Sequence, residues 1–466
     1  MTSSKRFRLY KFLFFINMMY TFSSFAGSES NVSGNWYGLL SYQGQDFPLI
    51  FRIDAADGRA FIDSPSQNAY NIPAEVVKNE NSSITLVSSI LDVNFKGEII
   101  VHAGGPFIFG LWKQGDIELK LKLYKRVEGS GSPSYRTEHL SFKGIEGKLS
   151  GTLSFPKGND LQTLLILCHG SGPHTREQIV AGHKTFEVLT NHLNSLGFSV
   201  FSYDKRGTGS SKGDFMFTSL KDQLDDLYTI IDNLSNRPEF SNYSIGLMGH
   251  SEGSLRAAEA SSSQHVKFIV MLAPPIADGV DLIRDQNRIA IGKMALSKKA
   301  KTLILSTMDV IYEEVIANSD VITTKLKVNE HIDEIWEDLG SEDKKLLMEW
   351  KLNLVRQLTD NSLLGASDRD FIKAKPMNII SRIRKPTLVL FGGKDVQVEA
   401  SKNSKLLNMS KVNVHIESHI MPNMNHIFQE TTNGAVELYY RPIEPMSKTM
   451  VSYIENWVIK NQLFKN

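Results

Sequence analysis

Hydrophobic and polar residues alternate through the first quarter of the chain. Residues 117–123, IELKLKL, keep a period of two without a break, which is the pattern of a β-strand with one buried face. Further short apolar runs cover residues 34–40, 47–53 and 84–87. Asp57-Gly58 lies between two such segments and is typical of a hairpin turn. This succession of strands predicts a small all-β domain over residues 27–127, either a sandwich or a partly closed barrel.

The pattern changes at residues 128–137, EGSGSPSYRT, which have the composition of a linker. Beyond them, short runs that are almost wholly apolar alternate with amphipathic segments of helical period. The apolar runs cover residues 161–168, 198–203, 244–249 and 266–272, and the helical segments cover residues 185–196, 220–234 and 254–260. Strands that alternate with helices predict a mostly parallel sheet with helices on both faces.

This alternation stops between residues 276 and 380. Lys, Glu, Leu and Ile recur there at helical spacing, for example over residues 344–357, so we expect an all-helical insertion that lies above the strand ends as a cap. Apolar runs return at residues 387–391 and 412–416, and a helical pattern covers residues 446–459. Residues 138–466 are therefore predicted to form one α/β domain with a helical cap at 276–380.

Composition narrows the class of protein. The chain has 466 residues, of which 41% are hydrophobic and 22% charged, and its formal net charge is +1. These values indicate a globular protein of two or three domains, with no charge pattern that favours nucleic acid as a partner. Cys168 is the single cysteine, which excludes an intramolecular disulfide or a zinc site of several cysteines. We expect Cys168 to be a small buried residue at a strand end.

The N-terminus has its own pattern. Four basic residues precede the apolar run at residues 12–16, and small residues stand at Ser24 and Ala26. This arrangement predicts a secretory signal peptide over residues 1–26, cleaved near Ala26, and hence export to the periplasm or the medium. The apolar part is shorter than the ~20 residues that a membrane-spanning helix needs, so we expect no stable membrane anchor.

The strongest chemical signal is the segment at residues 244–253, SIGLMGHSEG. An apolar run ends in the pattern Gly-x-Ser-x-Gly and passes directly into a helical segment, which is the context of a nucleophile elbow. The sharp turn crowds the positions two before and two after the serine, and these are Gly249 and Gly253. The pattern therefore predicts Ser251 as an exposed nucleophile.

A serine nucleophile needs a base, and the base needs an orienting acid. On a sheet of this kind the acid and then the histidine follow the serine in the chain, each after a strand. Asp395 comes directly after the predicted strand at 387–391, and His426 lies in the loop after the last predicted strand. These two are the predicted partners, with Glu399 as a substitute acid that stands closer to the next helix.

Three other histidines are weaker candidates for the base. His415 falls inside the last predicted strand, His419 comes early in the loop that follows, and His250 adjoins the nucleophile on the elbow itself. None of these positions matches the expected place of the base past a strand end.

Acyl transfer also needs backbone N–H donors for the oxyanion. We expect one from Glu252, the residue after the nucleophile, and the other from Ser171, with Gly170 as an alternative, because glycines let this loop approach a substrate. The Gly-rich loop at residues 203–211 lacks the Gly-Lys-Ser/Thr ending of a phosphate-binding loop. It is interpreted as a structural loop held by hydrogen bonds of Asp204 and Arg206.

Four motifs combine into a family resemblance. They are HGSGP at 169–173, D-x-RG-x-G-x-S at 204–211, GHSEG at 249–253 and NH at 425–426. The chain from about residue 135 to 466 resembles the α/β-hydrolase superfamily, in particular serine esterases of its dienelactone-hydrolase-like and prolyl-oligopeptidase-like branch, several of which carry an N-terminal β domain. The resemblance implies an α/β-hydrolase fold and a triad of Ser251, Asp395 and His426. Dienelactone hydrolases proper have a cysteine where this chain has Ser251, a departure that favours ordinary ester hydrolysis.

The resemblance implies a small-molecule ester as substrate and neither cofactor nor metal. Other readings stay open: a serine peptidase or a thioesterase would use the same triad. A catalytically inactive protein that binds a lipid or glycan in the β domain is the alternative from another class. In that domain Trp36 stands between two glycines, which is more typical of a core residue than of a ligand contact. The sequence leaves the natural substrate and the oligomeric state open.

Overall fold

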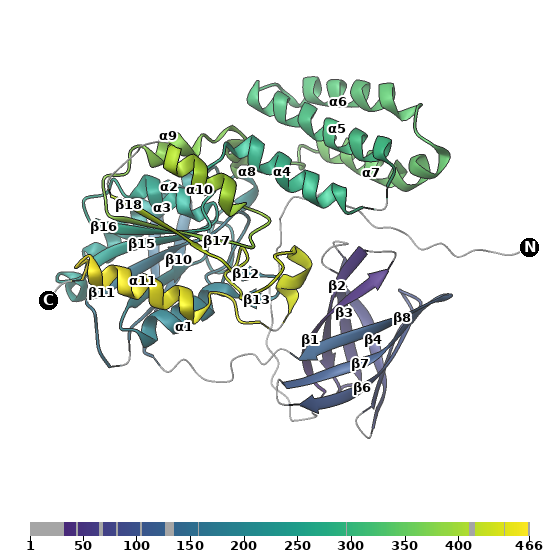
Figure 1. Cartoon of the computed structure of the whole chain (residues 1–466), viewed down its shortest axis with the longest axis horizontal. Coiled ribbons are helices and arrows are strands. Elements are labelled where there is room, and N and C mark those ends of the chain that lie inside the picture. Colours follow the sequence, from purple (N-terminus) through teal and green to yellow (C-terminus); the bar gives the residue numbers. More distant parts are fainter. Residues whose placement is uncertain are drawn as a thin grey trace, which may run out of the picture.

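The computed structural model describes residues 32–464, except residues 43–44, 65–68, 81–82, 103–104, 126–134, 157, 295, 410–414 and 442. It contains a β barrel, an α/β domain and a layer of helices inserted into that domain (Figure 1). The predicted signal peptide, residues 1–26, and most of the predicted linker lie outside the described residues. Thr137, the last residue of that predicted linker, already begins a strand of the α/β domain.

The N-terminal part is a closed barrel of antiparallel strands, each paired with the next and the last paired with the first. The strands are β1 (Gly34–Tyr42), β2 (Gln45–Asp54), β3 (Arg59–Ser64), β4 (Ala69–Glu80), β5 (Ser83–Ser88), β6 (Val93–His102), β7 (Gly105–Gln114) and β8 (Ile117–Lys125). The sequence predicted either a sandwich or a partly closed barrel, and the structure shows a closed barrel. Because the sheet closes on itself, no edge strand of the barrel is unpaired.

Alternate residues of these strands fill the barrel. Trp36, Phe51 and Phe95 are fully buried inside it, and the ring of Phe51 meets that of Trp112 edge to face, with 6.0 Å between centroids. The indole N–H of Trp36 donates to the carbonyl oxygen of Val32 at 2.8 Å. Trp36 is therefore a core residue of the barrel, as its sequence context favoured.

The α/β domain is built on an eight-stranded sheet in the order β18-β17-β16-β15-β11-β14-β10-β9. The strands are β9 (Thr137–Gly144), β10 (Gly147–Ser154), β11 (Thr163–Cys168), β14 (Ser199–Tyr203), β15 (Ser244–His250), β16 (Val266–Leu272), β17 (Thr387–Gly392) and β18 (Ile416–Met421). Strand β10 pairs in antiparallel fashion with β9 on one side and with β14 on the other. The remaining neighbours in the sheet, from β14 through β11 to β18, pair in parallel. A short hairpin, β12 (Ile179–Val180) and β13 (His183–Lys184), stands apart from the sheet.

The last strand differs from the prediction. It was expected at residues 412–416, but β18 spans Ile416–Met421, and residues 412–414 lie outside the described residues. His415 precedes the strand, and His419, expected in a loop, pairs with Leu390 inside it. Because β18 is an edge strand with several exposed side chains, it lacks the continuous apolar run that marks a buried parallel strand.

Helices cover both faces of the sheet. Helices α1 (Thr185–Ser195) and α11 (Lys448–Lys460) pack on one face. Helices α2 (Leu220–Ser235), α3 (Gly253–Ala260), α9 (Pro376–Ile380) and α10 (Ala400–Met409) pack on the other. The fold class predicted from the alternation of strands and helices is confirmed.

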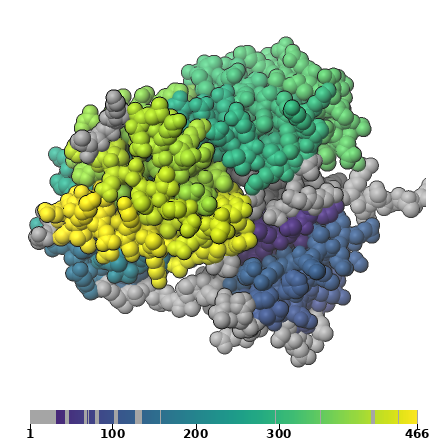
Figure 2. Space-filling model, in the orientation of Figure 1, coloured from purple at the N-terminus to yellow at the C-terminus, as the bar shows by residue number. Residues whose placement is uncertain are grey.

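The insertion between β16 and β17 is all-helical, as expected. It consists of α4 (Gly279–Gly292), α5 (Lys298–Ile316), α6 (Val321–Trp336), α7 (Ser341–Thr359), α8 (Ala366–Lys373) and α9. Helices α5, α6 and α7 pack around their own apolar core, in which Leu303, Val328 and Leu354 are fully buried. Figure 2 shows this layer, in green, as a lobe distinct from the blue barrel. Strands β1 and β2 of the barrel contact the C-terminal 3₁₀ turn η4 (Val436–Tyr440).

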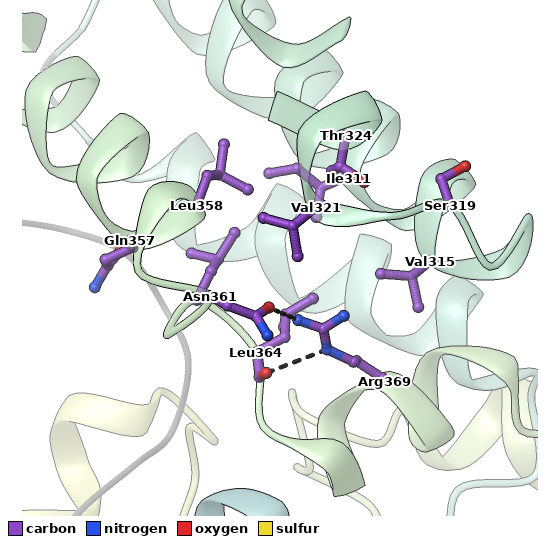
Figure 3. A pocket seen from close by; sticks show the side chains of 11 residues that line it. Ile311, Val315, Ser319, Val321, Thr324, Gln357, Leu358, Asn361, Leu364 and Arg369 are labelled. Carbon is purple, nitrogen blue, oxygen red and sulfur yellow. Dashed lines mark hydrogen bonds between the residues drawn. The ribbon is translucent and has the colours of Figure 1, made fainter. Parts of the chain in front are cut away.

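The helical layer also contains a small pocket between α5, α6 and the end of α7 (Figure 3). Its volume of about 30 Å³ is room for little more than one water molecule. The Nε of Arg369 donates to the carbonyl oxygen of Leu364 at 3.3 Å at its edge. The pocket lies within the helical layer, and Ser251, Asp395 and His426 are not among the residues that line it.

Candidate active site

The turn at Ser251 has the strained geometry of a nucleophile elbow. Strand β15 ends at His250 and α3 begins at Gly253, and Ser251 between them has a φ of +53°, a conformation that costs a non-glycine residue roughly 1–2 kcal/mol. A Cβ on Gly249 would lie 2.3 Å from the carbonyl oxygen of Gly253, and a Cβ on Gly253 would lie 2.2 Å from that of Cys168. Only glycine fits at either position, which is the constraint that the sequence pattern indicated.

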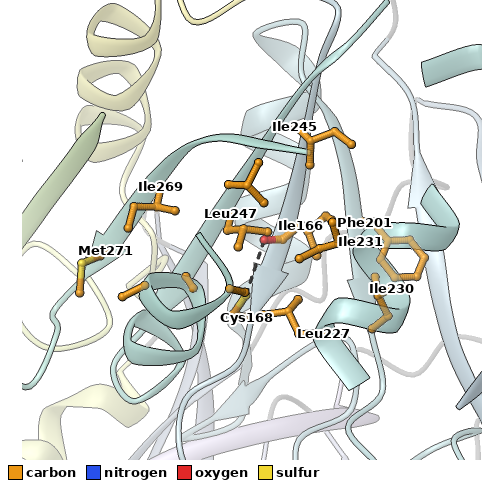
Figure 4. Close-up of a cluster of buried hydrophobic side chains, with 14 of the residues drawn as sticks. Ile166, Cys168, Phe201, Leu227, Ile230, Ile231, Ile245, Leu247, Ile269 and Met271 are labelled. Carbon is orange, nitrogen blue, oxygen red and sulfur yellow. Dashed lines mark hydrogen bonds between the residues drawn. The ribbon is translucent and has the colours of Figure 1, made fainter. Parts of the chain in front are cut away.

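Cys168 ends the neighbouring strand β11, and Figure 4 shows it within a cluster of buried apolar side chains. It is buried among apolar side chains that include Leu227 and Leu247, and burial raises the pKa of its thiol to about 12. A thiol that stays protonated is a poor nucleophile. Cys168 is a packing residue, as expected.

His426 and Asp395 form the pair that the sequence predicted. The Nδ1 of His426 lies 2.7 Å from Oδ2 of Asp395, and both side chains are buried. The other carboxylate oxygen of Asp395 accepts the backbone N–H groups of Gln397 at 2.8 Å and Val398 at 2.9 Å. These bonds fix the carboxylate, so that Nδ1 of His426 donates to Asp395 and Nε2 is left free to accept a proton.

Glu399, the substitute acid, is not part of this pair. Its side chain is exposed and accepts a hydrogen bond from the hydroxyl of Ser401. Its carbonyl oxygen accepts the backbone N–H of Asn403 in the first turn of α10. The backbone carbonyl of Glu399 therefore accepts a hydrogen bond at the start of α10, and its side chain does not contact His426 through any hydrogen bond described for it.

His250 connects the elbow to the histidine loop. Its Nε2 lies 2.8 Å from the carbonyl oxygen of His426, and the two rings are 4.9 Å apart between centroids. His426 is thus tied to the residue that directly precedes Ser251. Sequence reasoning considered His250 only as a rival base, whereas the structure gives it a role in holding the site together.

Gln178 extends this connection to the loop after β11. Its Oε1 accepts the backbone N–H of Gly170 at 2.8 Å, and its Nε2 lies 3.2 Å from Nδ1 of His250. Because Oε1 is taken by a donor, Nε2 must donate to Nδ1, and His250 then carries its proton on Nε2 and donates to His426. Burial lowers the pKa of His250 to about 3, which agrees with this neutral tautomer.

Gln178 itself was missed by the sequence analysis. It is fully buried, with a φ of +43°, in an irregular segment before β12. No motif or periodic pattern marks that segment, so the residue becomes visible only through its contacts.

The segments that carry the predicted oxyanion donors both adjoin Ser251. A Cβ on Gly170 would be 3.5 Å from that of Ser251, so the loop that carries Gly170 and Ser171 runs beside Ser251. Glu252 follows Ser251 and stands at the N-terminus of α3, where backbone N–H groups and the helix dipole favour negative charge. The arrangement suits stabilisation of an oxyanion.

The loop at 203–211 is structural, as interpreted from the sequence. Asp204 accepts hydrogen bonds from the backbone N–H and the guanidinium of Arg176, at 2.9 Å and 2.6 Å. Arg206 donates to both carboxylate oxygens of Asp226 on α2. The side chains of Asp204 and Arg206 are thereby both paired within the protein.

The chain matches known proteins over this domain. A family model described as serine aminopeptidase, S33, matches residues 159–346. The esterase EstD of Thermotoga maritima is 22% identical over 330 residues, which cover 70% of this chain and 68% of that protein. Among solved structures, a Pyrococcus furiosus esterase aligns with a TM-score of 0.43 and 17% identity over 73% of this chain and 97% of its own. A serine hydrolase homologue from Coxiella burnetii aligns with a TM-score of 0.36 and 15% identity over 70% and 96%.

The sheet order and the elbow define the fold: the α/β domain has an α/β-hydrolase fold, and it follows an N-terminal β barrel. Within the described residues no cluster of three or more His, Cys, Asp or Glu is arranged to hold a metal ion. No helix in that part of the chain is both long and apolar enough to span a membrane.

Proposed function

We propose that this α/β-hydrolase is a carboxylic ester hydrolase that works through an acyl-enzyme on Ser251, with His426 as base and Asp395 as its orienting acid. The observation that carries the proposal is the buried 2.7 Å contact between His426 and Asp395, in a loop that His250 ties to the strained elbow of Ser251. The similarity to an esterase from Thermotoga maritima supports ester substrates.

The geometry suggests the role of each group. His426 takes the proton of the Ser251 hydroxyl through Nε2, because Nδ1 is held by Asp395. Ser251 then attacks the acyl carbon, and the backbone N–H groups of Ser171 and Glu252 stabilise the oxyanion. His426 passes the proton to the leaving alcohol, and a water molecule activated by the same histidine hydrolyses the acyl-enzyme.

A serine peptidase is the second candidate, because the matching family model is described as a serine aminopeptidase. A thioesterase would use the same groups. The reactions differ in the leaving group, an amine, a thiol or an alcohol, and therefore in the substrates that are turned over. A small-molecule ester remains the proposed substrate class, with no cofactor.

The test is hydrolysis of p-nitrophenyl esters from acetate to laurate, with aminoacyl p-nitroanilides and an acyl thioester as rival substrates. Wild type should cleave esters fastest, and Ser251→Ala should lose the activity. Ser241→Ala, which changes an exposed serine, is the matched control and should behave as wild type. Faster turnover of the anilides would favour the peptidase, and a folded protein without activity on any substrate would favour the binding protein.

We also propose that the protein is exported, since residues 1–26 have the pattern of a signal peptide. Expression of the full chain followed by cell fractionation and N-terminal sequencing tests this. Mature protein in the periplasm or medium that begins near Gly27 is the expected result, and uncleaved protein in the cytoplasm would contradict it.

A further inference from the structure

Lys205 is buried at the back of the predicted oxyanion loop. Among the side chains that the structure describes it is the one buried lysine, with 4% of its surface exposed. Its ammonium donates to the carbonyl oxygens of Gly170 at 2.6 Å and Gly172 at 3.1 Å. Removing an ammonium from water is costly, and buried lysines are normally paired with a carboxylate. The hydrogen bonds of Lys205 go instead to the loop beside Ser251.

The loop that carries Lys205 has other supports. On one side of it Asp204 is bonded to Arg176, and on the other Arg206 is bonded to Asp226. These pairs anchor the segment to Arg176 in the loop after β11 and to α2 without the help of Lys205. The buried charge is therefore not explained by the stability of its own loop.

The contact with Gly170 acts on the predicted oxyanion donor directly. The carbonyl of Gly170 and the N–H of Ser171 belong to one planar trans peptide unit, so they point in opposite directions. With the carbonyl held by Lys205, the N–H of Ser171 faces away from the ammonium. Gln178 holds the other side of Gly170 through its N–H, and Lys205 also holds the carbonyl of Gly172. Ser171 is thus fixed between two anchored glycines.

We propose that Lys205 is a positioning residue that orients and polarises the Gly170–Ser171 peptide so that the Ser171 N–H stabilises the oxyanion. This inference rests on the proposed function, because it assigns Lys205 to the chemistry of Ser251. A positive charge on the carbonyl side of a peptide draws electron density from its N–H and strengthens that N–H as a donor.

The surroundings of Lys205 give the proposal a pH signature. Burial lowers the pKa of Lys205 to about 8, with Arg256 on α3 acting in the same direction, while Glu252 on the elbow, Asp368 on α8 and Cys168 raise it. His169 and His174, which lie near Lys205, have pKa values lowered by burial and then by its charge, so they are neutral here. The ammonium is present at neutral pH, and turnover should fall as the pH rises through about 8.

The test compares Lys205→Met, a neutral side chain of similar length, with Lys205→Arg, which keeps its charge at all accessible pH values. Kinetics are measured on a p-nitrophenyl ester between pH 6 and 10, with active sites counted by a fluorophosphonate. Lys205→Met should lower kcat per active site by roughly 10²-fold, as loss of one oxyanion donor does, with KM changed less than threefold and no alkaline fall. Lys205→Arg should keep more activity and show no fall near pH 8. Lys221→Met, at a side chain that is 80% exposed, is the matched control.

The outcomes separate this inference from the proposed function. A folded Lys205→Met enzyme with kcat within threefold of wild type, or with an alkaline fall still near pH 8, overturns the role of Lys205 while Ser251-dependent hydrolysis stands. If Lys205→Met does not fold, an unchanged alkaline fall in Lys205→Arg overturns it in the same way. Wild-type protein without Ser251-dependent hydrolysis of any ester overturns both.

Discussion

Replacing Asp395 by asparagine should trap His426 in the wrong tautomer. One oxygen of Asp395 accepts two backbone N–H groups, from Gln397 and Val398, and the other faces Nδ1 of His426. In Asp395→Asn the amide oxygen takes the place that faces the two N–H donors, and the NH₂ group faces His426. Nδ1 must then accept, so the proton moves to Nε2, and the base can no longer take the proton of Ser251.

The structure sets the size of the effect. To restore the working tautomer the amide must flip and leave the two N–H groups without an acceptor, at about 1–3 kcal/mol each. The active form then costs roughly 2–6 kcal/mol, which at 1.36 kcal/mol per decade is ~30-fold to ~10⁴-fold in kcat. Loss of the negative charge that stabilises the imidazolium adds to this, so we expect a value near the upper end, as in other triads.

The assay is kcat on a p-nitrophenyl ester, measured for Asp395→Asn, Asp395→Ala and Glu399→Gln. Asp395→Ala leaves the tautomer of His426 unconstrained, so Asp395→Asn should be at least as impaired. Glu399→Gln should keep wild-type activity, because that side chain is exposed and bonds to Ser401. An asparagine variant tenfold more active than the alanine variant would refute the tautomer argument, and loss of activity in Glu399→Gln would refute the choice of acid.

Three further predictions concern stability. Gln178→Leu leaves the N–H of Gly170 and Nδ1 of His250 buried without partners, so the free energy of unfolding in urea should fall by about 2–6 kcal/mol; a change below 1 kcal/mol would contradict this. Burial lowers the pKa values of His174 and His250 from 6.5 to about 3. The stabilisation that depends on these two side chains being neutral is therefore present above pH 6.5 and is lost as the pH falls towards 3. Between pH 6.5 and 5 these two should lower the free energy of unfolding by ~3 kcal/mol, seen by circular dichroism as a lower Tm, whereas a constant Tm would argue against neutral buried histidines. Leu354→Ala in the helical layer should lower stability by about 2–5 kcal/mol, checked by thermal unfolding, and an unchanged Tm would show that this core is not tightly packed.

Local patterns explain why much of the fold could be predicted. A buried parallel strand must be apolar on both faces, so β11 and β15 are visible as apolar runs. The elbow needs glycine on both sides of Ser251, and that steric rule is written in five consecutive residues. Strands β18 and β9 lie at the two edges of the sheet and need no continuous apolar run. For this reason β18 was misplaced and β9 was not foreseen as a strand of the sheet.

The supports of the candidate site carry no such signal. Gln178 bonds to His250 across 72 residues of sequence, and Lys205 bonds to Gly170 across 35. An isolated Gln in a loop, or a Lys in a glycine-rich segment, has many possible surroundings. Their partners are known only once the loop after β11, the elbow and the histidine loop have come together.

The sequence by itself determined the change from strand pattern to alternating strands and helices, the place of the helical insertion, and the residues Ser251, Asp395 and His426 as candidates. Periodicity and steric crowding act between neighbours in the chain, and so they leave local marks. Tertiary structure alone decided that the barrel closes, that Asp395 and not Glu399 meets His426, and that a buried lysine holds the loop beside the serine. Burial and hydrogen bonding between distant segments depend on which surfaces exclude water together, and that is a property of the folded chain.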